Sequence, residues 1–338
     1  MSRKLRELPK PFFVLAPMDD VTDSVFRRMV ASTAAPDVFF TEFANVDGLQ
    51  SPGRARLLKK LRFTETEQPL VAHIWGLKPE NFYKTTQEIA DGSLARQFGL
   101  PEGVNFAGID LNMGCPAKAE VKAGACSALI NDRPLAHEII TATQEGAAGQ
   151  LPVSVKTRLG FSDIDLSWHE FLLGHNLDML TIHARTRKEM SKVPAHWEQF
   201  AAICELRDCI SPDTLLVGNG DIMNREHGSQ LAEQYGLDGV MIGRGVFQDP
   251  YAFAAASPWP TMSRKERLAL YRRHVELFAE TWQTGDRPIH TLNKFCKIYV
   301  SDFDGAKELR EQLMAATSTD ELLSLLTEAQ TTATATLI

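Results

Sequence analysis

Short apolar runs recur along the first three-quarters of the chain, and they constrain its fold more than any other sequence feature. Each run is four to six residues long, rich in β-branched or aromatic side chains, and lacks the polar alternation of a half-exposed strand. Strands of this kind are buried on both faces, as in a parallel sheet covered by helices. The candidate strands are residues 12–17, 38–41, 70–74, 108–111, 153–156, 179–183, 215–219 and 239–243.

Segments with helical spacing of apolar residues lie between these strands. They cover residues 21–31, 79–90, 134–148 and 224–235, with Asn224 as a candidate N-cap of the last segment. Alternation of buried strand and helix eight times over predicts an α/β protein of the (β/α)8 TIM-barrel class. A doubly wound open sheet is the alternative, but no Gly-x-Gly-x-x-Gly follows the first strand.

The pattern changes after Pro250, and Pro258-Trp259-Pro260 marks a boundary. Helical spacing continues over residues 265–281, 292–300, 306–316 and 320–327, the last with Thr319 or Asp320 as its cap. We expect a catalytic barrel over residues 1–255, a small all-helical domain over 256–330 and a frayed tail over 331–338.

Charge and cysteine content narrow the class of protein further. The five cysteines are scattered without a Cys-x-x-Cys pair, which argues against a disulfide framework or a zinc site and predicts a reducing cytoplasm. No apolar run approaches the ~18–20 residues of a membrane span, so we expect no membrane segment. The net charge is −7, yet residues 261–315 hold ten Lys and Arg against eight Asp and Glu. This locally basic segment is compatible with RNA binding.

Polar side chains gather at the carboxyl ends of the predicted strands, where barrels place their active sites. They are Glu42, His73, Asn112 with Cys115, Lys156 with Arg158, His183 with Arg185, Asn219-Gly220-Asp221 and Gly243-Arg244-Gly245. The two glycine-rich turns follow the seventh and eighth strands, where barrels commonly bind phosphate. A polar excursion at residues 161–166 is expected to border the same site.

Each of these residues also has a structural interpretation. Cys115 lies between Gly114 and Pro116, which suits a thiol that meets a substrate at one angle, although a small buried cysteine is the alternative. Lys156 either reaches the barrel mouth or faces an electron-rich cofactor such as a flavin. His183 could be a core histidine bonded to backbone, and the Arg185 and Arg187 pair could be surface charge.

Taken together, the motifs make the chain resemble the tRNA-dihydrouridine synthases, the flavin-dependent family that reduces uridine in RNA. The matching motifs are Leu15-Ala16-Pro17-Met18, Thr41-Glu42, Asn112-Met113-Gly114-Cys115-Pro116, Val155-Lys156-Thr157-Arg158, Ile182-His183-Ala184-Arg185-Thr186-Arg187, Gly218-Asn219-Gly220-Asp221 and Met241-Ile242-Gly243-Arg244-Gly245. The resemblance spans roughly residues 13–325, and the Asn-x-Gly-Cys-Pro element is its most specific part.

The resemblance implies a bound FMN across the barrel mouth and NADPH as its transient reductant. It assigns the flavin ring to Ala16, Pro17, Met18, Lys156 and His183, and the phosphate end to Asn219, Gly220, Asp221, Gly243 and Arg244. It also makes Cys115 the general acid, which protonates C5 of a uridine in tRNA after hydride reaches C6. Asn112, Lys156 and Arg158 would bond the uracil, and Arg185, Arg187 and the helical domain would contact tRNA phosphates. We expect a monomer without a metal.

The chain departs from the family pattern at two positions. His73 stands on the third strand where the family usually has a Gln that bonds the flavin, and Cys126 stands where a small residue is usual. We interpret Cys126 as a packing variant. Two other functions stay open: a flavin barrel that acts on a free pyrimidine or small enone, and a flavin-bound RNA-binding protein with little turnover.

Overall fold

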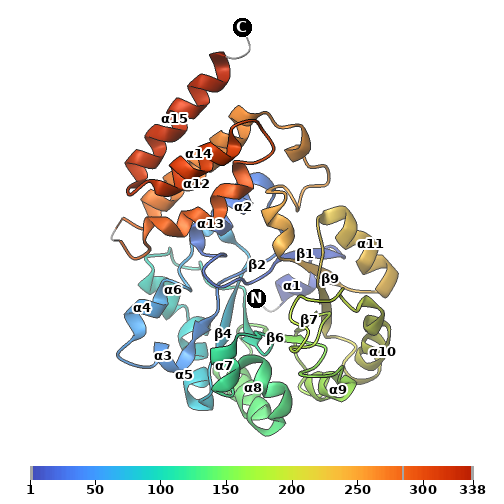
Figure 1. Ribbon diagram of the computed structural model, residues 1–338. Coiled ribbons are helices and arrows are strands. Elements are labelled where there is room, and N and C mark those ends of the chain that lie inside the picture. The colour runs from blue at the N-terminus through green and yellow to red at the C-terminus, as the bar shows by residue number, and fades with distance from the viewer. Residues whose placement is uncertain (1–2, 284, 336–338) are drawn as a thin grey trace.

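In a computed structural model that describes residues 3–283 and 285–335, the predicted strands surround a common axis (Figure 1). The sheet formed by these residues contains β1 (Phe12–Leu15), β2 (Phe39–Phe40), β3 (Ala44–Asn45), β4 (Leu70–Trp75), β5 (Gly108–Asn112), β6 (Val153–Arg158), β7 (Met179–His183), β8 (Leu215–Asn219) and β9 (Gly239–Ile242). All eight predicted runs therefore correspond to strands within two residues at either end, and β2 is the shortest of them, at two residues.

The strands pair in parallel in the order β1-β9-β8-β7-β6-β5-β4-β2, with β3 added beside β4. A parallel bridge between Val14 and Val38 joins the two ends of this order, and Leu15 N donates to Val38 O at 3.0 Å. The sheet thus closes on itself. The predicted barrel class is confirmed, and the open doubly wound sheet is wrong.

Helices follow the strands and cover the outside of the barrel (Figure 1). They are α2 (Ser24–Ala34), α3 (Val46–Leu49), α4 (Arg54–Leu58), α5 (Pro79–Ala90), α6 (Ser93–Gln97), α7 (Lys118–Lys122), α8 (Arg133–Ala147), α9 (Leu166–Leu173), α10 (Phe200–Ile210) and α11 (Arg225–Tyr235). Four 3₁₀ turns accompany them: η1 (Glu65–Glu67), η2 (Cys126–Asn131), η3 (Trp197–Gln199) and η4 (Arg244–Phe247).

N-caps set where two of the predicted helices begin. Asn224 Oδ1 accepts a hydrogen bond from His227 N at 2.9 Å, as predicted. The first helix was predicted from residue 21 but begins at Ser24, because Asp23 Oδ1 accepts from Phe26 N at 2.9 Å and so fixes the N-cap.

Apolar side chains fill the barrel interior at the end opposite the carboxyl ends of the strands. Phe12, Val14 and Phe40 pack there with Leu5 of α1 (Arg3–Arg6), in one buried cluster. The helix α1 accordingly appears within the ring of strands in Figure 1. Because packed side chains close this end, the polar side chains at the carboxyl ends of the strands line the opposite, open mouth.

The C-terminal helices form a layer on one side of the barrel, at the top of Figure 1. They are α12 (Arg264–Thr281), α13 (Asn293–Tyr299), α14 (Ala306–Ala315) and α15 (Thr319–Ala335), with short turns η5 (Trp259–Thr261) and η6 (Ile289–Leu292). Phe295 stacks on Phe26 of α2 with ring centroids 5.1 Å apart, and Trp282 Nε1 donates to Asp23 Oδ2 at 3.2 Å. The division of the chain at residues 255 and 256 stays a prediction.

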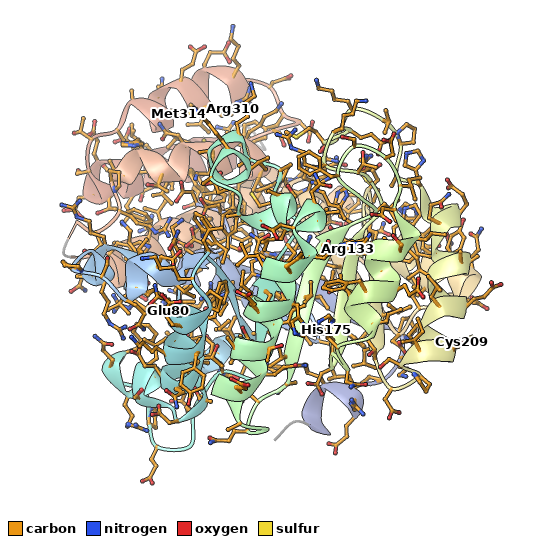
Figure 2. The ribbon with its side chains drawn as sticks, turned by 90° about the horizontal axis from the view of Figure 1, so that it is seen from below. Glu80, Arg133, His175, Cys209, Arg310 and Met314 are labelled. Atoms are coloured by element: carbon orange, nitrogen blue, oxygen red, sulfur yellow. The ribbon has the colours of Figure 1, made fainter. Side chains whose placement is uncertain are left out.

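The final helix differs from the predicted one at both ends. Ser318 Oγ, rather than Thr319 or Asp320, accepts the hydrogen bond of Glu321 N at 3.2 Å. Residues 331–335 of the predicted frayed tail continue α15, and residues 336–338 lie outside the described residues. Arg310 and Met314 mark α14 in Figure 2, on the opposite side of the molecule from Cys209 of α10. None of the described helices is long and apolar enough to cross a membrane.

Candidate functional site

A pocket of about 700 Å³ opens at the carboxyl ends of the strands. Its volume falls in the range of ~300–1,000 Å³ that is typical of small-ligand sites. The sequence-predicted residues that line it are Ala16, Pro17, Met18, His73, Asn112, Cys115, Lys156, Arg158, His183, Asn219, Gly220, Asp221, Gly243 and Arg244. Of the residues predicted for the site, Glu42, Arg185 and Arg187 do not line it.

A tight turn after β5 presents Cys115 to the pocket. Asn112 Oδ1 accepts hydrogen bonds from Gly114 N at 3.1 Å and from Cys115 N at 2.9 Å, so the asparagine shapes the turn. Its amide nitrogen has no hydrogen-bond partner among the described residues and is left for a ligand. A Cβ at position 114 would lie 3.2 Å from the backbone of Lys156 and Thr157, which explains the glycine. The thiol is therefore held at one place on the pocket wall.

Two cationic side chains from β6 face the same pocket. Arg158 Nε donates to Gly114 O at 2.8 Å and thus ties β6 to the cysteine turn. Lys156 Nζ donates to Asn219 Oδ1 at 3.4 Å, so the amine reaches the mouth. Burial lowers the pKa of Lys156 to about 8 and that of Arg158 to about 10. These groups supply hydrogen-bond donors, and Arg158 stays charged at neutral pH.

Two histidines of the pocket differ in their hydrogen bonding. His73 is buried and its Nδ1 lies 2.6 Å from Asp110 Oδ2, while Ser154 Oγ donates to Asp110 Oδ1 at 2.5 Å. His183 Nδ1 is buried and has no partner in the described part of the chain. Burial and the neighbouring cations hold the pKa of His183 well below its usual value, so the ring is neutral. A neutral ring with a free nitrogen is suited to a ligand atom.

The glycine turns after β8 and β9 form the other wall of the pocket. Asp221 accepts from Arg185 and from Arg244 Nη2, the latter at 3.0 Å. Burial raises the pKa of Asp221, but the hydrogen bond and charge of Arg185 outweigh it and hold the pKa below the usual value. The carboxylate is thus ionised and orients Arg244, whose side chain is 61% exposed. The assignment of Asp221 to the phosphate end stays a prediction, and its carboxylate pairs with Arg185 and Arg244.

Arg185 and Arg187 do not form the exposed pair that an RNA contact needs. Arg185 is only 2% exposed, and its Nε donates to Val193 O at 2.6 Å. The predicted contact of Arg185 with tRNA phosphate does not fit this burial. The Arg187 guanidinium lies 5.3 Å from the Phe161 ring centroid, outside the pocket lining. Only Phe161 of residues 161–166 packs against Arg187, residues 162–164 are exposed, and the segment does not line the pocket that it was expected to border.

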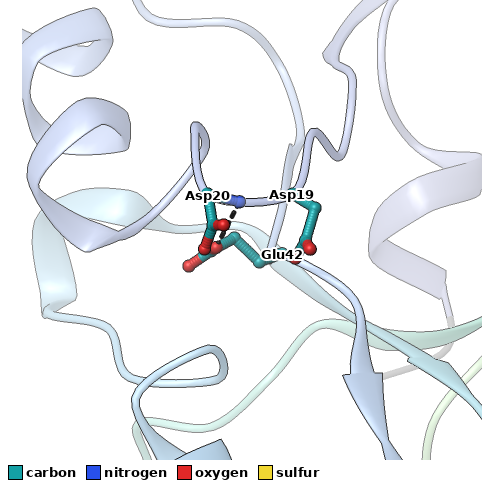
Figure 3. A group of neighbouring side chains, drawn as sticks. All are labelled: Asp19, Asp20 and Glu42. Atoms are coloured by element: carbon teal, nitrogen blue, oxygen red, sulfur yellow. Dashed lines mark hydrogen bonds between the residues drawn. The ribbon is translucent and has the colours of Figure 1, made fainter. Parts of the chain in front are cut away.

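Three carboxylates converge beside the pocket, from the loop after β1 and the end of β2. Asp19, Asp20 and Glu42 lie close together in Figure 3, where Asp20 N donates to Glu42 Oε1 at 2.7 Å. Lys60 pairs with Asp19, and Arg287 of the C-terminal segment pairs with Glu42. The cluster is thus an ion-pair network with its own cations. It joins the loop of Met18 to the C-terminal helices.

Sequence reasoning missed several residues of the site. Asp110 lies within an apolar strand and was not predicted, although a single charged residue in a buried strand indicates a paired or functional group. Phe43 and Glu120 also line the pocket, and Phe43 packs edge-on against His73 with centroids 6.0 Å apart. Neither had a motif to identify it, because each depends on how a loop folds over the mouth.

A closed α/β barrel thus carries a fixed thiol, buried cations and glycine turns together at its mouth, which is the arrangement of a barrel active site. The sequence model of the dihydrouridine synthase (Dus) family matches residues 14–335. The chain belongs to this family.

Relatives support the same assignment. The chain is 50% identical over 325 residues to a probable tRNA-dihydrouridine synthase 2 of Bacillus subtilis (strain 168), with 95% of this chain and 94% of the relative covered. It is equally similar, with the same coverage, to a probable tRNA-dihydrouridine synthase of Staphylococcus aureus (strain COL).

Solved structures show a more distant likeness. Morphinone reductase in complex with tetrahydroNAD aligns with a TM-score of 0.46 and 11% identity, over 71% of this chain and 84% of the reductase. A variant of NCR from Zymomonas mobilis aligns with a TM-score of 0.45 and 12% identity, over 70% of this chain and 83% of that protein. This similarity is too distant to bear on function.

Proposed function

We propose that the protein reduces specific uridines of tRNA to 5,6-dihydrouridine, with FMN bound at the barrel mouth and NADPH as the reductant. The observation that carries this proposal is the position of Cys115, which shares one pocket with Lys156, Arg158 and an unpartnered His183 nitrogen. Family membership and the 50% identical relatives, probable tRNA-dihydrouridine synthases, support the reaction.

The donor set of the pocket fits FMN. The free His183 nitrogen and the Lys156 amine suit the polar edge of a flavin ring. Arg244 and the glycine turns 219–221 and 243–245 suit a phosphate monoester, since the arginine is held by Asp221 and exposed on its outer side. Ala16, Pro17 and Met18 offer a flat, weakly polar backing. FMN, when bound, would supply the hydride for C6 of the uracil.

The chain's own residues then bind the base and move one proton. Hydride addition at C6 leaves negative charge on C5 and its neighbouring carbonyl, and the S–H of Cys115 protonates C5. Arg158 and the free Asn112 amide nitrogen would donate to the uracil oxygens and stabilise that charge. Since a base inside a helix cannot reach such a pocket, the uridine must be turned out of its stack.

We also propose how the protein contacts tRNA and where it acts. We assign phosphate contacts to Arg187 and to the locally basic C-terminal helices, while Arg185 acts indirectly by holding Asp221. The proposed protein is a cytoplasmic monomer with a catalytic barrel at 1–255 and an RNA-binding helical domain at 256–330. His73 takes the place of a glutamine contact to the flavin, with its Nδ1 already engaged by Asp110.

One assay separates the proposed function from its alternatives. Purified protein reconstituted with FMN should oxidise NADPH in the presence of bulk tRNA and leave dihydrouridine in that RNA, as measured by mass spectrometry of digested nucleosides. Reduction of free uridine or a small enone at a similar rate would favour the second function. FMN and tRNA binding without product would favour an RNA-binding protein with little turnover.

A further inference from the structure

A row of three polar side chains runs from one strand to the next behind the wall of the pocket. His73 on β4, Asp110 on β5 and Ser154 on β6 lie directly opposite one another on neighbouring strands. All three are buried, and only His73 lines the pocket. Ser154 Oγ donates to Asp110 Oδ1 at 2.5 Å, and His73 Nδ1 lies 2.6 Å from Asp110 Oδ2. A buried carboxylate is thus connected to the pocket through one histidine ring.

The ring of His73 is held in one orientation. Phe40 and Phe43 each pack edge-on against it, with ring centroids 6.0 Å apart. The backbone is fixed as well, because His73 N donates to Thr41 Oγ1 at 3.0 Å. Nδ1 is engaged by Asp110, whereas Nε2 has no hydrogen-bond partner among the described residues. Nε2 is therefore the ring nitrogen that is left for a ligand.

We propose that Asp110 is a positioning residue for cofactor binding: its carboxylate keeps the proton of His73 on Nδ1, so that the Nε2 lone pair accepts a hydrogen bond from the flavin ring. This inference rests on the proposed binding of FMN. A carboxylate only accepts hydrogen bonds, so the ring nitrogen that faces it carries the proton. In the neutral imidazole the other nitrogen is then an acceptor. The polar edge of an oxidised flavin offers one N–H between two carbonyl oxygens, and such an acceptor suits that N–H.

The neighbouring charges fit an ionised Asp110. Burial lowers the pKa of Lys156 to about 8, and the negative charge of Asp110 acts against this lowering. Lys156 and Arg158 can only donate hydrogen bonds when they are charged, so they suit the carbonyl oxygens of a ligand. The polar row adds the acceptor that these two cations do not supply. If Asp110 only joined strands, its effect on a ligand would not depend on the residue at position 73.

The first test is the tautomer of His73 in the full-length protein without added FMN. Long-range proton–nitrogen correlation spectra of isotope-labelled histidine show it at about pH 8, where an ordinary imidazole is neutral. The His73 signals are those, among nine histidines, that His73→Gln removes. We expect the wild type to carry the ring proton on Nδ1. In Asp110→Asn the amide oxygen keeps the bond from Ser154 and the amide N–H faces Nδ1, so the proton should move to Nε2.

The second test is FMN affinity, measured by fluorescence titration. Asp110→Asn converts Nε2 from an acceptor to a donor and should weaken FMN binding by roughly tenfold. In a His73→Gln background the same substitution should change the affinity by less than about twofold, because a glutamine amide donates and accepts without help.

The matched control is Asp238→Asn. Asp238 is also a buried carboxylate with two partners, Lys10 at 2.6 Å and Arg207 at 2.8 Å, but it precedes β9 and does not line the pocket. Its substitution should leave the tautomer of His73 and the affinity for FMN unchanged. Thermal unfolding checks that each variant is folded.

A wild-type ring with its proton on Nε2 would overturn the proposal without any variant. An unchanged tautomer in folded Asp110→Asn, or an equal loss of FMN affinity from Asp110→Asn in both backgrounds, would also overturn it. The tautomer is measured without flavin or RNA. Failure of this proposal is therefore distinguishable from failure of the proposed function, which would appear as absence of dihydrouridine with the wild-type protein.

Discussion

The two walls of the pocket are built on different principles. The thiol wall, residues 112–117 with 126–127, has most of its polar groups engaged in internal hydrogen bonds, and its reactive sulfur is fixed by the Asn112 turn. The glycine wall, residues 219–221 with 243–245, carries an exposed arginine and little side-chain bulk. Chemistry needs a group held at one angle, whereas ligand binding needs donors that are still free. The thiol wall provides the fixed reactive group, and the glycine wall provides the free donors.

Removal of the thiol should have the largest effect on turnover. We expect Cys115→Ala to reduce the rate of dihydrouridine formation by about 10²–10⁴-fold, the usual contribution of a general acid. Flavin affinity, measured by fluorescence titration, should change little, because the glycine wall is untouched. An unchanged rate of reduction would remove Cys115 from the role of acid.

Removal of Arg244 should lower flavin affinity and leave turnover largely intact. Arg244→Ala deletes a charged donor to a phosphate, an interaction of about 1.5–3 kcal/mol, and should weaken FMN binding by roughly tenfold to a hundredfold. The rate at saturating FMN should fall far less.

The matched control is Arg133→Ala on α8. Arg133 pairs with Asp165 at 3.1 Å, much as Arg244 pairs with Asp221, but does not line the pocket. Equal losses of FMN affinity in both variants would mean that the glycine wall does not hold the phosphate.

The two walls also differ in the space around their backbones, and exchange of a glycine for alanine in each wall tests this difference. Gly114→Ala places a Cβ 3.2 Å from the β6 backbone, which has little freedom to move. We expect the variant to lose about 1–3 kcal/mol of unfolding free energy through overpacking, and turnover to fall roughly tenfold as the thiol shifts.

On the other wall, Gly243→Ala meets only Ala16 Cβ at 3.5 Å and Met18 Sδ at 3.9 Å, which are ordinary contacts. Its unfolding free energy should stay near that of the wild type, while FMN affinity falls. Thermal unfolding and flavin titration check the pair. Equal stability of the two variants would show that the thiol wall is not tightly packed.

The fold was largely predictable from the sequence, and the reason is physical. Parallel barrel strands are apolar on both faces, so their pattern survives in the sequence, and α5 was predicted at its observed bounds. The short β3 and α3 were missed because two to four residues carry no periodicity. The helix α9 was also missed, since its eight residues are few and the polar Ser167, His169 and Glu170 do not fall on one face opposite the apolar ones.

The position of a site residue was predictable where a motif ends a strand. The hydrogen-bond partners of its side chain were less predictable. Strand-end position was enough to place Lys156 and His183 in the pocket. It could not show that Arg185 turns inward to Asp221, because that depends on the path of the following loop. The hydrogen bond from Ser127 to the Cys115 carbonyl was equally hidden, since eleven residues, those of α7 included, separate the two along the chain.

The smallest predicted effect is the pH dependence of base reduction, and it tests whether the thiol wall acts as an acid. The protonated thiol is the active form, and the pKa of Cys115 is about 7. The active fraction therefore falls as pH rises through 7, by roughly fivefold between pH 7 and pH 8. Lys156, with a pKa of about 8, loses its charge in the same direction.

The measurement is reoxidation of the reduced enzyme by tRNA under single-turnover conditions, which removes the NADPH step from the profile. We expect the rate to decline above pH 7 in the wild type. The control is Cys296→Ala, whose profile should follow the wild type. A rate that is flat or rising up to pH 9 would mean that the proton comes from a group other than Cys115, and the thiol wall would then only shape the pocket.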